Sequence, residues 1–241
     1  MIEYLDPKLA YLFLTIPFVV LWVIFIVVSR NTRREQLHAS IIFALVGVFV
    51  ENILYFGDYW KPESVWGVYI GSFAIFPEFI LFGGSFAGIA AVVYQVVFRK
   101  ETKRIITAGK TRRQLAVLTI FLLVTAFLSM SGVNSIYATA GGALAVTALI
   151  SILRRDLFVP ATLSGLLTAG IMFSFYSIGV HTVGNIEQLF KEIWLLYDTD
   201  LGFRLMGIPI TELVWGFAVG SAVGVLYKFA SGFKFLSDEL N

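Results

Sequence analysis

Long apolar runs alternate with short polar segments along the whole chain, and each run is about the length of a membrane-crossing helix. The hydrocarbon core of a bilayer is spanned by roughly 20 helical residues, and seven runs meet that length. They are predicted at residues 9–29, 37–56, 76–98, 113–131, 134–153, 157–180 and 205–229. The pattern therefore predicts an all-α integral membrane protein with about seven transmembrane helices.

The composition supports this class. The chain is 58% hydrophobic and 14% charged, with a mean hydropathy of +0.84, whereas soluble domains carry about 25% charged residues. It has no cysteine and two histidines far apart in sequence, so we expect no disulfide and no metal site. Glycine-rich phosphate loops are absent and the net charge is only +2, so we expect no nucleotide or nucleic acid partner. The expected location is the cell membrane, as a multi-pass protein in contact with lipid.

The basic residues predict the orientation of the helices. Fourteen of the 18 lysines and arginines lie in alternate connections, namely 30–38, 99–113, 154–155 and the segment after 227. Because such an excess marks the cytoplasmic side, the N-terminus is predicted outside and the C-terminus in the cytoplasm. The first run is interpreted as a transmembrane helix and not as a cleavable signal, since its positive charges follow it.

Two outer loops, 57–72 and 181–204, are rich in aromatic residues and are predicted to contain short surface helices. Each precedes a span that opens with a proline and a glutamate. This similarity indicates a weak parallel repeat of two three-helix units, which requires one extra helix between them. The predicted parts of this single membrane domain are residues 1–110 for repeat one, 111–133 for the connector helix and 134–241 for repeat two.

Three carboxylates fall within predicted spans: Glu51, Glu78 and Glu212. With a helical rise of about 1.5 Å per residue, they lie roughly 24 to 31 Å from the basic residues at the inner ends of their helices. All three are therefore expected in the outer third of the bilayer. Charged side chains inside a membrane are costly and usually functional.

Two of these acids also lie on helix faces suited to packing. Glu212 is in line with glycines at 216, 220 and 224, and Glu51 is in line with Ser40, Ala44 and Gly47. Small residues at this spacing allow close helix approach. The sequence therefore predicts one shared polar site under the outer surface.

A carboxyl group removed from water, beside a second one, suits acid and base chemistry on an apolar substrate. Aromatic faces, from the 23 phenylalanines and other rings, can stabilise a cation. Structural roles remain open for each acid. Glu51 can hydrogen-bond to a neighbouring helix with Asn52 as partner, Glu78 can cap its helix, and Glu212 can be a packing residue.

The stretch LMGIPITELVWGFAVGSAVGVLYKFASG, at 205–232, resembles the lycopene cyclase domain family, as does FAIFPEFILFGG at 73–84. This family carries a Pro-x-Glu-Glu motif at the start of a span in each of two halves. Here the second copy reads Pro209-Ile-Thr211-Glu212, with threonine in place of the first glutamate, and the first copy keeps one glutamate, Glu78.

The resemblance implies protonation of the terminal double bond of a linear polyene, closure of a six-membered ring and removal of a proton. Glu212 is the expected acid, with Glu78 or Glu51 as its partner or base. The expected substrate is a carotenoid or another long isoprenoid, no cofactor is required by the sequence, and a homo-oligomer is compatible with it. Residues expected to contact the substrate are Asn52, Trp66, His181, Trp194, Pro209, Thr211 and Trp215.

Two alternatives use the same features. A non-catalytic carotenoid or lipid binder, or a proton-coupled transporter, can employ the same intramembrane acids. A retinal protein shares the topology but is disfavoured, because the lysine of the last span, Lys228, lies at its inner end.

Overall fold

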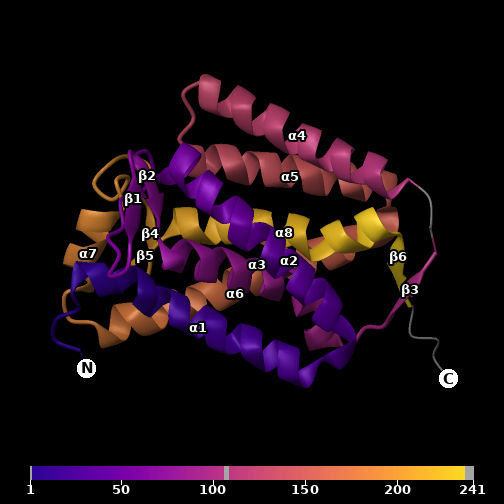
Figure 1. Ribbon diagram of the computed structural model, residues 1–241, viewed down its shortest axis with the longest axis horizontal. Helices are drawn as coiled ribbons and strands as arrows, with labels where there is room; N and C mark the ends of the chain where they lie inside the picture. The colour runs from indigo at the N-terminus through magenta and orange to yellow at the C-terminus, as the bar shows by residue number, and fades with distance from the viewer. Residues whose placement is uncertain (1, 106–108, 237–241) are drawn as a thin grey trace.

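The computed structural model describes residues 2–105 and 109–236, and it is a bundle of long helices lying roughly along one direction (Figure 1). Seven helices of the described part are long and apolar enough to cross a membrane. The prediction of an all-α fold with seven helices that could span a membrane is confirmed. Residues 106–108 of the predicted cytoplasmic connection at 99–113 lie outside the described residues.

The seven long helices follow the predicted runs closely. They are α1 (Pro7–Val28), α2 (Arg33–Val50), α3 (Pro77–Phe98), α4 (Lys110–Met130), α5 (Ser135–Leu153), α6 (Phe158–Thr182) and α8 (Ile210–Ser231). Turn and cap residues explain several boundaries. Asp6 accepts a hydrogen bond from the backbone of Lys8 before Pro7 opens α1, and Asn134 caps α5 in the same way. Both are preferred N-cap residues.

Short strands and one short helix connect these helices at their ends. The strands are β1 (Val68–Ile70), β2 (Phe73–Ile75), β3 (Thr102–Arg104), β4 (Arg204–Leu205), β5 (Ile208–Pro209) and β6 (Phe233–Phe235). They form three antiparallel pairs, β1 with β2, β4 with β5, and β3 with β6. The helix α7 (Ile186–Ile193) lies with β1, β2, β4 and β5 at one end of the bundle, here called the hairpin end, while β3 and β6 lie at the opposite end (Figure 1).

Three sequence-based details differ from the structure. The loop 181–204 contains the expected short helix, α7, but the loop 57–72 leads into the β1–β2 hairpin and has no α-helix. The seventh span begins at Ile210 and not at 205, because residues 204–209 pair as β4 and β5. Glu51 begins a π-helical turn, Glu51–Tyr55, and does not continue the α-helix of α2.

The central helices α3 and α8 hold the bundle together through small residues. Along α8, a Cβ built on Gly216, Gly220 or Gly224 would lie 2.3 to 2.6 Å from side-chain atoms of α6. A Cβ built on Gly83 or Gly84 of α3 would lie 2.9 or 3.3 Å from backbone atoms of α2. Close backbone approach between membrane helices depends on such residues, and the predicted packing faces of Glu212 and Glu51 are confirmed.

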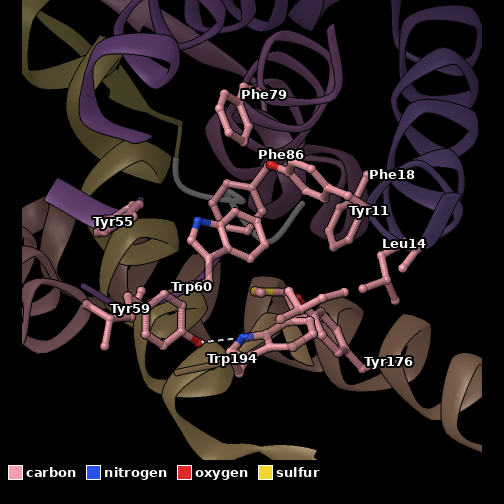
Figure 2. Packing of buried hydrophobic residues seen from close by; sticks show 14 of the residues in the cluster. Tyr11, Leu14, Phe18, Tyr55, Tyr59, Trp60, Phe79, Phe86, Tyr176 and Trp194 are labelled. Carbon is pink, nitrogen blue, oxygen red and sulfur yellow. Dashed lines mark hydrogen bonds between the residues drawn. The ribbon is translucent and has the colours of Figure 1, made fainter. Parts of the chain in front are cut away.

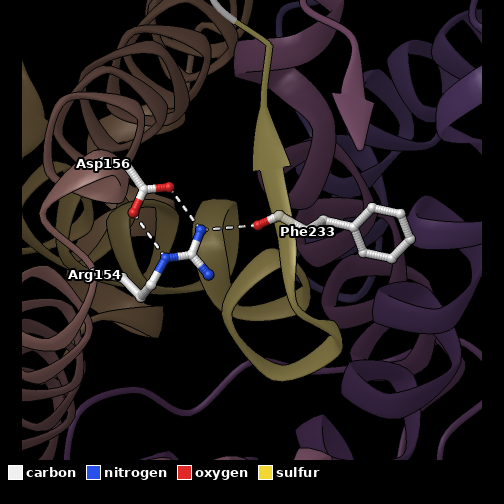
Figure 3. Close-up of polar contacts among 3 residues, drawn as sticks. All are labelled: Arg154, Asp156 and Phe233. Atoms are coloured by element: carbon white, nitrogen blue, oxygen red, sulfur yellow. Dashed lines mark hydrogen bonds and ion pairs between the residues drawn. The ribbon is translucent and has the colours of Figure 1, made fainter. Parts of the chain in front are cut away.

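The opposite end is closed by polar contacts of the chain with itself. Arg154, which follows α5, donates from Nε and Nη2 to the two carboxylate oxygens of Asp156 at 2.7 and 2.6 Å. Its Nη2 also donates to the carbonyl oxygen of Phe233 in β6 at 3.0 Å (Figure 3). Nearby in the fold, Lys228 of α8 forms a buried ion pair with Glu35 of α2 and donates to the carbonyl of Ala91 in α3 at 2.7 Å. This pair joins three helices.

Candidate functional site

Glu212 lies in the first turn of α8 with both carboxylate oxygens engaged by donors from other elements. Oε1 accepts from the indole Nε1 of Trp194 at 2.9 Å and from the hydroxyl of Tyr59. Oε2 accepts from the hydroxyl of Tyr176 at 2.9 Å. Glu212 is buried, with 5% of its surface exposed. Three donors are a set that suits an ionised carboxylate, which can only accept.

The helix register explains why Tyr176 reaches this carboxylate. Three glycines of α8, spaced four residues apart, each contact a side chain of α6, and these side chains are also spaced four residues apart. The pairs are Gly216 with Met172, Gly220 with Thr168 and Gly224 with Ser164. The next step of this antiparallel register pairs Glu212 with Tyr176. The glycine face therefore positions the acid as well as packing the helices.

Glu51 has a second, similar arrangement at the end of α2. Its Oε2 accepts from the indole Nε1 of Trp60 at 2.8 Å, and both residues are buried. The π-helical turn that begins at Glu51 ends at Tyr55. Turns of this kind occur mostly as single distortions in helices and often at functional sites.

The two indoles that hold these carboxylates lie against each other. The ring centroids of Trp60 and Trp194 are 5.9 Å apart, and their backbones meet in an antiparallel bridge. Tyr11 of α1 packs edge-on against Trp60 at 4.7 Å. Figure 2 shows these rings together, with the hydrogen bond between Tyr59 and Trp194 drawn. The structure thus brings Glu51 and Glu212 to one aromatic cluster at the hairpin end.

Tyr59 links the carboxylate of Glu212 to a further hydroxyl. Its oxygen lies 2.9 Å from Oγ1 of Thr211 and accepts from Nε1 of Trp194 at 2.9 Å. Burial raises the pKa of Tyr59 well above its usual range, and the charge of the adjacent Glu212 adds to this. The Tyr59 hydroxyl therefore keeps its proton and remains a donor to Glu212.

Glu78 occupies the first turn of α3 and is fully buried. Its Oε2 accepts from the hydroxyl of Ser64 at 2.8 Å, while its Oε1 is buried and has no hydrogen-bond partner among the described residues. Glu78 thus lies at the same end of the bundle as the other two acids, but its hydrogen bond goes to a different segment.

Three of the residues expected to bind substrate lie beside Glu212, and a fourth lies close by. Trp194 and Thr211 belong to the hydrogen-bonded set described above, and Pro209 is buried in β5 immediately before α8. Trp215, one turn into α8, donates to the hydroxyl of Tyr55 at 2.9 Å and packs on Phe86 at 4.8 Å.

The other three expected contact residues have different surroundings. Asn52 holds β2 in place, since it accepts from the backbone N–H of Ala74 at 2.6 Å and donates to its carbonyl at 2.7 Å. Trp66 is 59% exposed. His181 is exposed and its Nδ1 lies 2.7 Å from the carbonyl of Ser177 on its own helix.

Four aromatic residues of this site were not predicted from the sequence, namely Tyr55, Tyr59, Trp60 and Tyr176. The sequence contains a signal for two of them. Tyr176 continues the four-residue spacing of Ser164, Thr168 and Met172, and Trp60 lies in the same aromatic loop as Trp66, which was chosen in its place.

The fold and this site define a helical membrane protein with two buried carboxylates held by paired indoles. Residues 134–230 match the family model described as lycopene cyclase. This part of the chain is therefore similar to the lycopene cyclase family, as the resemblance of the sequence indicated. This segment contains Tyr176, Trp194 and Glu212, whereas Glu51 and Trp60 precede it. No curated protein and no solved structure matches the chain.

Proposed function

We propose that the protein is a carotenoid cyclase that isomerises the end group of a linear carotenoid or related isoprenoid by acid and base catalysis at Glu51 and Glu212. The observation that carries this proposal is the pair of buried carboxylates, each of which accepts a hydrogen bond from an indole. The ring centroids of the two indoles are 5.9 Å apart. The lycopene cyclase match over 134–230 supports the same substrate class.

The hydrogen bonds favour a division of roles between the acids. Glu212 accepts from three donors, which favours its charged form as the base. Glu51 accepts from one indole, so it is the better candidate for the acid. This reverses the expectation from sequence that Glu212 is the acid. Glu78, with its unpartnered oxygen, remains a candidate for a supporting acid.

In the proposed reaction, the O–H of Glu51 gives its proton to the terminal carbon–carbon double bond. The resulting cation is attacked by a neighbouring double bond, so that a six-membered ring closes. Glu212 then removes a proton from the ring and a new double bond forms. Substrate and product are isomers, nothing is oxidised, and no cofactor takes part. The rings of Trp60, Trp194 and Tyr11 would stabilise the cation.

We further propose the topology predicted from the basic residues, with the N-terminus and the hairpin end outside the cell membrane. A parallel repeat is supported by matching features. Three-residue 3-10 turns, Arg30–Thr32 and Arg155–Leu157, precede α2 and α6, and strand pairs precede α3 and α8. Arg99 and Gly232, both with positive φ, end α3 and α8. On this basis residues 1–110 and 134–241 are the repeats and 111–133 is the connector.

The proposed activity can be tested in cells that make lycopene. Expression of the wild-type chain should convert lycopene to a product of the same mass with altered chromatographic retention and a less structured absorption spectrum. If the carotenoid copurifies with the protein unchanged, the chain is a binder. If lycopene and shorter or longer linear carotenoids are all left unchanged and unbound, the proposed substrate class is wrong.

A further inference from the structure

Two buried hydroxyl groups lie in a row between Glu212 and a small pocket at the hairpin end. The hydroxyl of Tyr59 donates to Oε1 of Glu212 and lies 2.9 Å from Oγ1 of Thr211. Both residues are buried, with 2% and 3% of their surface exposed. Because a hydroxyl both donates and accepts, such a row can pass a proton along.

Thr211 is also part of the wall of that pocket. The pocket has room for about one water molecule. Its lining combines residues of the site with residues of the loop that joins α7 to β4, and the polar or aromatic members are Trp194, Tyr197, Phe203, Arg204 and Thr211.

The loop side of the pocket faces the surroundings of the protein. Phe203 is 68% exposed and Arg204 is exposed. The guanidinium of Arg204 lies 4.0 Å from the centroid of the Tyr197 ring. The pocket therefore lies between the surface and the buried hydroxyls.

The proposed isomerisation creates a need for such a route. After one turnover Glu212 carries an extra proton and Glu51 has lost one, so Glu212 must release a proton to water and Glu51 must take one up from water before the next turnover. The chain of contacts that joins the two carboxylates runs through the indoles of Trp60 and Trp194. An indole N–H donates but has no acceptor, so these rings cannot relay a proton from Glu212 to Glu51.

We propose that Thr211 and Tyr59 form the proton exit from Glu212 to the pocket under Arg204. This rests on the proposed function of Glu212 as the base. The protonated carboxyl gives its proton to the oxygen of Tyr59, the Tyr59 proton passes to Thr211, and the Thr211 proton passes to water in the pocket. Each oxygen gains one proton and loses one, and the hydroxyls then rotate back.

The route can be tested without an activity assay, by measuring hydrogen–deuterium exchange at the indole N–H groups. Trp60 and Trp194 are a matched pair, since each is buried and each donates to a carboxylate. Trp60 is the more exposed, at 6% against 2% for Trp194, but Trp194 lines the pocket. We expect the Trp194 indole to exchange faster in D₂O, measured by NMR on protein labelled with ¹⁵N-tryptophan and assigned with single tryptophan-to-phenylalanine variants.

The role of the Thr211 hydroxyl is tested by Thr211→Val and Thr211→Ser in the cyclisation assay. Valine keeps the shape but removes the hydroxyl, so turnover should fall by about tenfold or more and the solvent deuterium isotope effect should rise. Serine keeps the hydroxyl and should restore both values. A merely structural role of Thr211 would leave the isotope effect unchanged.

The outcomes separate this inference from the proposed function. If wild type cyclises no carotenoid, the proposed function fails, while faster exchange of Trp194 still supports an open route to the site. If Trp194 exchanges no faster than Trp60, the route is overturned. It is also overturned if wild type cyclises and Thr211→Val matches it in rate and isotope effect.

Discussion

Gly220 of α8 lies so close to Thr168 of α6 that a Cβ added to the glycine would be 2.6 Å from the threonine Cβ. Contacts of this kind recur at Gly216 and Gly224, and the same register brings Tyr176 to Glu212. The spacing of α6 and α8 therefore determines the geometry of the site. A change at this interface should affect both the stability of the bundle and the position of the carboxylate.

Gly220→Ala should destabilise the protein by about 1 to 3 kcal/mol, because the added methyl group forces the helices apart or Thr168 aside. Gly170→Ala, in α6, is the matched control, since a Cβ there meets nothing within 4 Å, and alanine favours a helix over glycine by about 1 kcal/mol. Thermal unfolding in detergent should show a lower midpoint for the first variant only. Equal midpoints would mean that α6 and α8 are not in close contact.

The buried pair of Lys228 and Glu35 should be strongly coupled. Lys228 is 1% exposed, so Lys228→Met leaves the Glu35 carboxylate buried without its partner and should cost about 3 to 5 kcal/mol. The double variant Glu35→Met with Lys228→Met should recover much of this loss. A double-mutant cycle on unfolding free energies measures the coupling, and additive effects would argue against a buried ion pair.

Asn52 should contribute to stability and not to chemistry. Asn52→Ala removes two hydrogen bonds to β2 and one to the carbonyl of Val48, and should cost about 1 to 3 kcal/mol. Gln188→Ala, at an exposed position of α7, is the surface control. Unfolding in denaturant gives both values. An Asn52→Ala protein as stable as wild type but inactive would instead favour the substrate contact expected from sequence.

Labelling tests the orientation. Because the chain has no cysteine, single variants Gln188→Cys and Lys103→Cys each carry one reactive thiol, and both positions are exposed. A membrane-impermeant maleimide should label position 188 in intact cells, and position 103 only after the membrane is opened. The opposite pattern would reverse the proposed topology.

The sequence was sufficient for the helices, because each apolar run has the length of a span and small residues recur on the packing faces. It also located Glu212, Trp194 and Thr211 at one site. Helix periodicity could not locate Tyr59 and Trp60, since they lie in an irregular turn after α2 whose path depends on contacts with the segment after α7.

The exposure of Trp66 and the ion pair of Lys228 also depend on contacts between distant parts of the chain. Trp66 and Trp194 each begin a Trp-x-x-Tyr stretch in an outer loop, and this pattern indicated Trp66 and not Trp60, but Trp66 is 59% exposed. Lys228 was interpreted as a basic residue at the inner end of its helix, and the structure buries it against Glu35, a residue 193 positions away in sequence. Neither relationship follows from local pattern.

The central claim is that Glu51 and Glu212 transfer protons to and from an isoprenoid. The most direct test is the conversion of lycopene by wild type, Glu51→Gln and Glu212→Gln, with Glu187→Gln as control on the exposed face of α7. Glutamine keeps the shape but cannot transfer a proton, so both site variants should lose about a hundredfold in turnover, equivalent to about 2.7 kcal/mol, while remaining folded. The Glu187→Gln control should match wild type. Full activity in either folded site variant would contradict the claim.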